Sequence, residues 1–186
     1  ADKIVFTGHP VHEGLLNAQV DRAAALQQMG LSPHKRTLLI VGGSLGARTL
    51  NESVLGNLPL VRQQNDIQFI WQTGGYYKEE IKAELARRGK PDNLYVTDFI
   101  SDMATAYAVA DLVISRAGAG SISEFCLLGK PVILVPSPNV AEDHQTKNAL
   151  ALVQRDAALY VKDSEARMTL LPLAINTITL PARCSS

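Results

Sequence analysis

Several features that would point to particular protein classes are missing from this 186-residue sequence. Lys and Arg together number 18, as do Asp and Glu, so the chain lacks the basic excess that captures the phosphate backbone of nucleic acids. It has two cysteines, Cys126 and Cys184, which are too few for a disulfide scaffold and agree with a reducing cytoplasm. We therefore expect no nucleic-acid partner and no disulfide-based fold.

Long apolar runs and metal-binding patterns are missing as well. No apolar run approaches the roughly 18 to 20 residues that span a bilayer, and the first residues lack the basic and apolar regions of a signal peptide. His9 and His12 lie close together, but no third and fourth ligand follow at the spacing of a zinc site. We expect a soluble chain with neither a bound metal nor a cofactor.

What the sequence does contain is a regular alternation of two patterns. Short runs rich in β-branched residues predict strands at 3–8, 36–43, 67–75, 93–100, 111–118, 131–137 and 158–163. Stretches with apolar residues at helical spacing predict helices at 21–30, 47–64, 76–89, 102–110, 120–129 and 142–155. This alternation predicts one α/β domain, a Rossmann-like doubly wound parallel sheet with helices on both faces.

Glycine and proline mark the ends of these elements. Gly30, Gly89 and Gly129 fall where a helix is expected to end in a left-handed cap. The residues from 164 onward begin like a helix, but they contain Pro172 and Pro181. Because proline breaks helices, we expect the last part of the chain to be irregular.

Two turns between a strand and a helix are unusually rich in small residues. In a parallel sheet the ligand crevice lies beyond the carboxyl ends of the strands, where helix N-termini present unpaired N–H groups. In "VGGSLGARTLN", residues 41–51, three glycines let the backbone approach an oxyanion, and Ser44 adds a hydroxyl. The alternative is a tight turn with a capping serine. The motif fits neither the dinucleotide nor the P-loop pattern.

The second small-residue turn is "SRAGAGSISE", residues 115–124. It places a second bare helix N-terminus after a strand, and two helix ends facing one crevice suit a diphosphate. Glu124 lies about one turn inside that helix, where its carboxylate can accept hydrogen bonds from a ribose diol. The alternative is that Glu124 interacts favourably with the helix dipole or forms a capping box with Ser121.

Two further segments follow strands at the same expected edge. In residues 136–150, His144 and Gln145 open a helix and can hydrogen-bond sugar hydroxyls, although an ordinary polar helix start explains them equally. In "TDFISDM", residues 97–103, the backbone can read the edge of a base, while packing and capping is the alternative explanation.

The order of these motifs resembles one family. "GGSLGARTLN", "DFISDMATAYAVADLVISRAGAGSISE", "GKPVILVPSP" and "EDHQTKNA" are similar to the C-terminal half of the MurG family of UDP-N-acetylglucosamine transferases. The similarity runs from about Val5 to about Asp163 and includes "GHPVH" at 8–12. The resemblance implies that residues 1–186 are the UDP-sugar-binding, C-terminal domain of a GT-B glycosyltransferase, with the N-terminal acceptor domain outside this chain.

The resemblance also implies a reaction and its setting. The family transfers N-acetylglucosamine from UDP-N-acetylglucosamine to lipid I, with inversion, and forms lipid II for peptidoglycan. The acceptor site, the general base and the membrane-facing patch are expected on the N-terminal domain, so catalytic residues are not assigned here. The implied location is the cytoplasm, at the cytoplasmic face of the bacterial inner membrane for a full-length enzyme, and this chain alone is expected to bind the donor without transferring it.

The resemblance assigns donor-binding roles to specific positions. Ser44 and the backbone of Gly118 to Ser123 are expected at the diphosphate, and Glu124 at the ribose. The main chain of Ile100 is expected to read uracil, with Met103 packed nearby. The full set is His12, Ser44, Ile100, Met103, Gly118, Ala119, Gly120, Ser121, Ile122, Ser123, Glu124, His144 and Gln145. Two of these depart from the common pattern: His12 replaces an arginine, and His144, which with Gln145 is expected to face the sugar, replaces an amide.

Other functions stay open from the residues alone. A 2-epimerase-like GT-B protein also handles UDP-sugars, but it needs acid and base groups that this sequence does not show. A nicotinamide dehydrogenase fits less well, because the fingerprint glycines are incomplete and no acid ends residues 67–73. A non-catalytic nucleotide-binding module is the third alternative.

Overall fold

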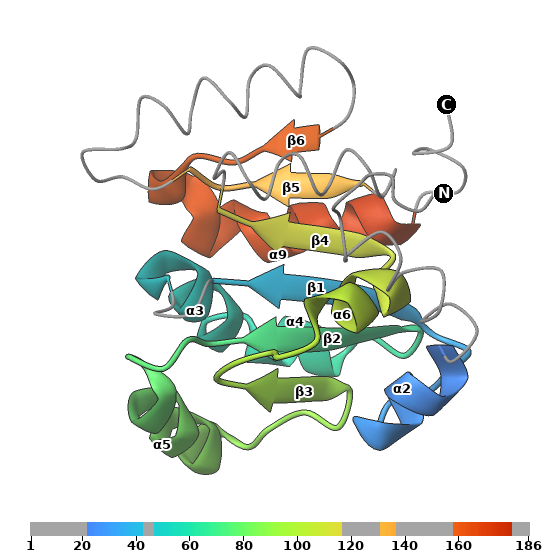
Figure 1. The fold of residues 1–186 in the computed structure, drawn as a ribbon. Helices are drawn as coiled ribbons and strands as arrows, with labels where there is room; N and C mark the ends of the chain where they lie inside the picture. Colours follow the sequence, from blue (N-terminus) through green and yellow to red (C-terminus); the bar gives the residue numbers. More distant parts are fainter. Residues whose placement is uncertain (1–21, 43–46, 117–130, 137–157, 180–186) are drawn as a thin grey trace.

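The computed structural model describes residues 22–42, 47–116, 131–136 and 158–179. The described residues form one six-stranded sheet in the order β3-β2-β1-β4-β5-β6, and every neighbouring pair is parallel. The strands are β1 (Arg36–Val41), β2 (Ile67–Gln72), β3 (Leu94–Thr97), β4 (Leu112–Ser115), β5 (Val132–Leu134) and β6 (Ala158–Tyr160). All the arrowheads in Figure 1 point the same way, so the carboxyl ends of the strands share one edge.

Helices cover both faces of this sheet. The described helices are α2 (Arg22–Gln28), α3 (Arg48–Leu55), α4 (Leu58–Arg62), α5 (Lys78–Arg88), α6 (Met103–Val109) and α9 (Asp163–Thr179). One hydrophobic cluster joins Leu38 and Ile40 of β1 to α3, α4, α5 and α9, and the other joins Leu39 to α2 and α6. Alternate β1 residues therefore face opposite layers, which confirms the doubly wound α/β prediction and explains why the central residues of β1, Leu38 to Ile40, are all apolar.

The sequence pattern predicted most of these elements at their observed places. Six of the seven predicted strands are observed, and the seventh, at 3–8, lies outside the described residues. Gly30 and Gly89 have positive φ angles of 77° and 86° and follow α2 and α5, as expected for cap glycines. The expected helices at 120–129 and 142–155, and Gly129, also lie outside the described part.

The single helix predicted over 47–64 is wrong in one respect. The chain forms two helices there, α3 and α4, separated by Gly56 and Asn57. Pro59 is in the first turn of α4, where its missing N–H costs no helical hydrogen bond. A proline that looked compatible with one long helix therefore marks the start of a second one.

The last described helix is longer than the proline at 172 led us to expect. Helix α9 continues through Pro172 to Thr179, and residues 180–186, including Pro181, are outside the described part. Pro172 lies on the exposed side, while Leu171 and Ala174 are buried against the sheet. Burial of this apolar face stabilises the helix enough to offset the hydrogen bond that proline cannot donate. Within the described ranges, no helix has the length and apolarity to cross a bilayer.

Replacing Pro172 with alanine tests the continuity of α9. Proline destabilises the interior of a helix by about 3 kcal/mol relative to alanine. Because proline also restricts the unfolded chain, about 1 kcal/mol of this cost is offset. We expect Pro172→Ala to raise the free energy of unfolding by about 2 kcal/mol, measured by urea titration. Asn176→Ala, one turn later on the exposed side, is the control and should change it by less than about 1 kcal/mol. A Pro172→Ala protein no more stable than the control would contradict a helix that continues through residue 172.

Candidate functional site

The site with the clearest structural basis lies where the strand order reverses. The chain adds β2 and β3 on one side of β1 and then returns to place β4 on the other side. In parallel sheets, such a reversal separates the connections that follow the two central strands and leaves a crevice between them. Val41 of β1 and Ser115 of β4 are register partners, so the chain leaves these strands side by side.

The two small-residue turns follow directly from these neighbouring strand ends. Gly42 is the last described residue before 43–46, and Arg116 is the last before 117–130. Thus both turns start at the same edge of the sheet and from adjacent strands, as the prediction of one shared crevice requires. The third segment, 137–157, follows Pro136 at the end of β5, the next strand in the sheet.

The described structure contains two of the predicted site residues, Ile100 and Met103. Both are partly buried and pack against the hydrophobic cluster on the α2 and α6 side of the sheet. Asp102 caps α6 by accepting hydrogen bonds from the Thr105 backbone N–H at 3.1 Å and from its hydroxyl at 2.6 Å. The segment after β3 is therefore held by a helix cap. The other predicted site residues lie outside the described ranges: His12, Ser44, Gly118, Ala119, Gly120, Ser121, Ile122, Ser123, Glu124, His144 and Gln145.

A partly buried ion pair near the ends of β4 and β5 was not predicted from the sequence. Arg116 Nη1 is 2.6 Å from Asp163 Oδ1, and these side chains are 20% and 12% exposed. The same nitrogen donates to the carbonyls of Val135 at 3.2 Å and Pro136 at 3.1 Å. The other carboxylate oxygen of Asp163 accepts from the Thr49 hydroxyl at 2.9 Å. The signal in the sequence was an arginine directly after an apolar strand, but its partner is 47 residues away.

A second buried network connects α3 to the end of β2. The Trp71 indole N–H donates to Asn51 Oδ1 at 2.9 Å, and Asn51 Nδ2 donates to the Thr73 carbonyl at 3.1 Å. Asn51 and Trp71 are 3% and 0% exposed. Since buried polar groups without partners are costly, this network fixes the first turn of α3 relative to the sheet.

Arg48, the first residue of α3, adds positive charge at this edge. Its guanidinium lies over the Tyr77 ring, 5.3 Å from the ring centre, and pairs with Glu52 at 3.6 Å. Tyr77, and then the carboxylates of Glu52 and Glu80, raise the pKa of Arg48 above its ordinary value. Arg48 is therefore charged throughout the physiological pH range.

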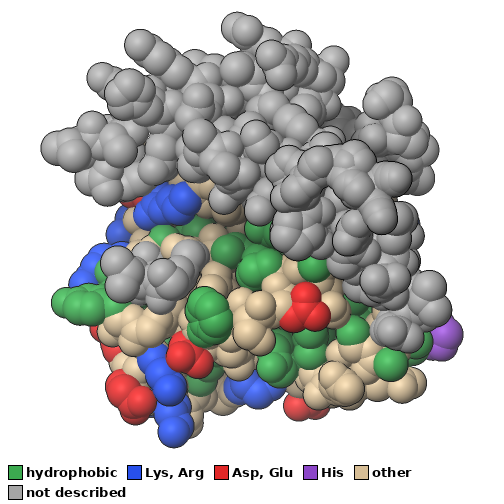
Figure 2. All heavy atoms as spheres, in the orientation of Figure 1, with side chains coloured by type: hydrophobic (Ala, Val, Ile, Leu, Met, Phe, Trp, Pro, Cys, Tyr) green, Lys and Arg blue, Asp and Glu red, His purple; other side chains and the backbone are tan. Residues whose placement is uncertain are grey.

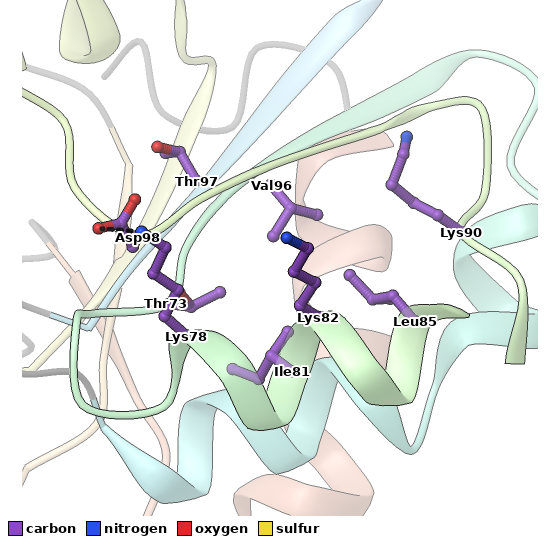
Figure 3. A pocket seen from close by; sticks show the side chains of 9 residues that line it. All are labelled: Thr73, Lys78, Ile81, Lys82, Leu85, Lys90, Val96, Thr97 and Asp98. Atoms are coloured by element: carbon purple, nitrogen blue, oxygen red, sulfur yellow. Dashed lines mark ion pairs between the residues drawn. The ribbon is translucent and has the colours of Figure 1, made fainter. Parts of the chain in front are cut away.

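A separate pocket lies at the β3 edge of the sheet (Figure 3). It has a volume of about 350 Å³ and lies between α5 and β3, with Ile81, Leu85 and Val96 among its lining. Three lysines line it too, and Lys78 forms a loose ion pair with Asp98 at 3.9 Å. Because β3 is separated from the β1–β4 junction by β2, this pocket is distinct from the crevice at the order reversal.

Figure 2 shows basic, acidic and hydrophobic side chains interspersed over the described part of one face. Among the residues that the structure describes, no three His, Cys, Asp or Glu side chains form a group that could hold a metal ion.

Comparisons with known sequences match the chain to one glycosyltransferase family. The sequence profile described as "Glycosyltransferase family 28 C-terminal domain" matches residues 37–183. A relative from Bacteroides fragilis, a UDP-N-acetylglucosamine–N-acetylmuramyl-(pentapeptide) pyrophosphoryl-undecaprenol N-acetylglucosamine transferase, is 62% identical over 178 residues. This alignment covers 96% of the chain and 47% of the relative, so the chain spans about half the length of the protein it matches.

Solved structures support the same fold. The crystal structure of MurG from Acinetobacter baumannii matches with a TM-score of 0.67 and 34% identity, covering 89% of this chain and 47% of the other. A UDP-N-acetylglucosamine 2-epimerase structure matches with a TM-score of 0.60 and 16% identity, covering 87% of this chain and 38% of that one. At that identity the second match shows the shared fold alone.

Changing Asn51 tests the network that fixes α3. Asn51→Leu keeps a side chain of similar size but leaves the Trp71 N–H and the Thr73 carbonyl without their observed partners. Each buried unpaired group costs about 1–3 kcal/mol, so we expect the free energy of unfolding to fall by about 2–4 kcal/mol in urea titration. Arg48→Gln, on the exposed side of the same turn, is the control and should cost less than about 1 kcal/mol. Equal effects of the two changes would show that the network does not fix the helix.

Proposed function

The chain belongs to the family of glycosyltransferase family 28 C-terminal domains, and from that premise we propose that it binds UDP-N-acetylglucosamine as the donor domain of an inverting transferase. The full enzyme transfers N-acetylglucosamine to lipid I and forms lipid II. The observation that carries the proposal is the pairing of Val41 with Ser115, since it brings the starts of both small-residue turns to one crevice. The high identity to the Bacteroides fragilis transferase supports the choice of substrate.

The proposed donor contacts divide according to the parts of the nucleotide. Ser44 and the backbone from Gly118 to Ser123 bind the diphosphate, while Glu124 binds the ribose hydroxyls. The main chain of Ile100, beside Met103, reads uracil at the end of β3. His144 and Gln145 face the sugar, and His12 lies near the nucleotide. The cap at Asp102 supports the uracil position, because it fixes the backbone immediately after Ile100.

The proposed chemistry needs groups that stabilise a leaving diphosphate. As the bond to the sugar breaks, negative charge grows on the oxygen of the departing UDP. Preorganised N–H groups and the positive ends of helices stabilise this charge more in the transition state than in the bound donor. The sequence around Ser44 and Gly118 supplies two such backbone turns, and Arg48 supplies a permanent positive charge at the first turn of α3.

The remaining parts of the reaction belong to the rest of the proposed enzyme. Since the chain spans 47% of the Bacteroides fragilis relative, we place lipid I recognition, the general base and membrane association in the other half. The full enzyme then acts in the cytoplasm, at the cytoplasmic face of the inner membrane.

Calorimetry with three ligands tests the donor assignment. We expect the chain to bind UDP-N-acetylglucosamine more tightly than UDP-glucose and to show no measurable binding of NAD. Glu124→Gln should weaken UDP-N-acetylglucosamine binding by about tenfold, because a charged acceptor of ribose hydrogen bonds becomes an amide. Glu79→Gln, on the exposed side of α5, is the control and should leave the affinity unchanged. Binding of NAD in preference to UDP-sugars would refute the assignment, and so would equal binding of the two UDP-sugars with no effect of Glu124→Gln.

A transfer assay tests the division of labour between the two halves. With UDP-N-acetylglucosamine and lipid I, we expect this chain to form little or no lipid II, because the proposed base and acceptor site lie elsewhere. The full-length Bacteroides fragilis relative serves as the positive control in the same assay. Sustained lipid II formation by the 186-residue chain would show that its own residues complete the reaction.

A further inference from the structure

Arg116, Asp163 and Thr49 occupy a particular place in the fold. Arg116 is the last described residue before 117–130, and the two carbonyls that it binds belong to Val135 and Pro136, directly before 137–157. Thr49 is in the first turn of α3, just after 43–46. A single, partly buried cluster thus lies next to one end of each of the three segments that follow β1, β4 and β5.

The main effect of this cluster is to fix the relative positions of the elements that it joins, not to raise the stability of the fold. Arg116 Nη1 contacts three oxygen acceptors, and both Asp163 oxygens have partners, so each charge is compensated where it lies. Breaking a largely buried charge pair is costly, yet apolar residues of similar volume often stabilise a core equally well. The charged cluster also fixes orientation, because each hydrogen bond restricts both the distance and the angle between the groups that it joins.

Helix α9 is the support for this cluster. Asp163 is its first residue, and α9 packs along α3. The Arg167 carbonyl accepts from Asn57 Nδ2 at 3.2 Å, and the Arg167 side chain pairs with Glu52. At the far end of α9, Arg36 of β1 donates to the Ile178 carbonyl. A movement of α9 would therefore be transmitted through Asp163 to the ends of β4 and β5.

We propose that Arg116 and Asp163, assisted by Thr49, are positioning residues that align the three segments around the diphosphate of the nucleotide-sugar. The proposal rests on the donor function proposed above. Binding constellations require their elements to be held to about 0.5 Å, and small displacements weaken them strongly. The cluster acts through the backbone of the strands and helices that it joins, and α9 becomes part of the donor site although it is remote in sequence.

The position of Ile100 allows an experiment to distinguish this role from a general loss of folded protein. Ile100, at the proposed uracil position, follows β3, which is separated from β4 by β2 and β1. Loss of the cluster should therefore weaken recognition of the diphosphate and leave recognition of the uracil base intact. A general loss of folded protein would instead reduce the apparent affinity for both ligands by the same factor.

The experiment compares the affinities for UDP and for free uracil in the 186-residue chain, measured by NMR titration. The variants are Arg116→Lys, which keeps the charge on a shorter side chain without the Nη1 donor, Asp163→Asn, and Thr49→Val. We expect the first two to weaken UDP binding by about tenfold and Thr49→Val by about threefold, with uracil binding unchanged. The double variant Arg116→Lys/Asp163→Asn should be hardly worse than either single variant, because both remove one interaction.

Arg167→Gln is the matched control. It removes the exposed Arg167–Glu52 ion pair, which joins α9 to α3 without involving Arg116 or Asp163, so UDP affinity should not change. Thermal unfolding of each variant shows whether it is folded, and Thr49→Val, which changes no charge, keeps the test valid if a charged variant fails to fold.

The outcomes separate the two proposals. Unchanged UDP affinity in Thr49→Val and in each folded charge variant would overturn the positioning role, as would equal weakening of UDP and uracil. A wild-type chain that binds neither ligand would refute the proposed donor function itself. Selective loss of UDP affinity, with an unaffected Arg167→Gln control, would support the role of the cluster.

Discussion

The parallel pairing of β1 with β4 is the constraint on which the rest of the structure depends. Because the chain places β2 and β3 on one side of β1 and β4 on the other, the two central strands end side by side. Both strands are buried on both faces, and Leu38, Leu39 and Ile40 divide between the two hydrophobic clusters. A shift in register by one residue would exchange these faces, so packing of the core also fixes where the carboxyl ends lie.

Around this junction, polar contacts hold the elements that the hydrophobic core alone would leave free to slide. Asn51 ties α3 to the end of β2, and Asp102 caps the helix that follows β3. Arg116 and Asp163 tie β4 and β5 to α9. Each contact lies at or near the edge where ligands bind in such folds. The amino-terminal edge serves stability in a similar way, for example where Asp111 accepts from the Thr37 backbone N–H at 2.8 Å.

Sequence patterns predicted the sheet well, because strand formation depends on local composition. Apolar β-branched runs predicted the positions of the six observed strands, and glycine residues predicted the ends of α2 and α5. The break at Gly56 and the continuation of α9 through Pro172 were missed, because each depends on which face is buried. The Arg116–Asp163 pair was missed for a related reason: nothing near Arg116 in the sequence identifies a partner at the start of the last helix. The predicted roles of Ser44, Glu124 and the other donor contacts remain proposals, supported by membership of the family.

The most direct test of a donor site at the β1–β4 junction is an NMR map of backbone amide shifts on addition of UDP. The account predicts that the largest changes among the described residues occur at Gly42, at Ala47 to Thr49, at Ser115 and Arg116, and near Ile100. Changes confined instead to the pocket between α5 and β3, at Lys78, Lys82 and Lys90, would place the nucleotide at the edge of the sheet and contradict the account.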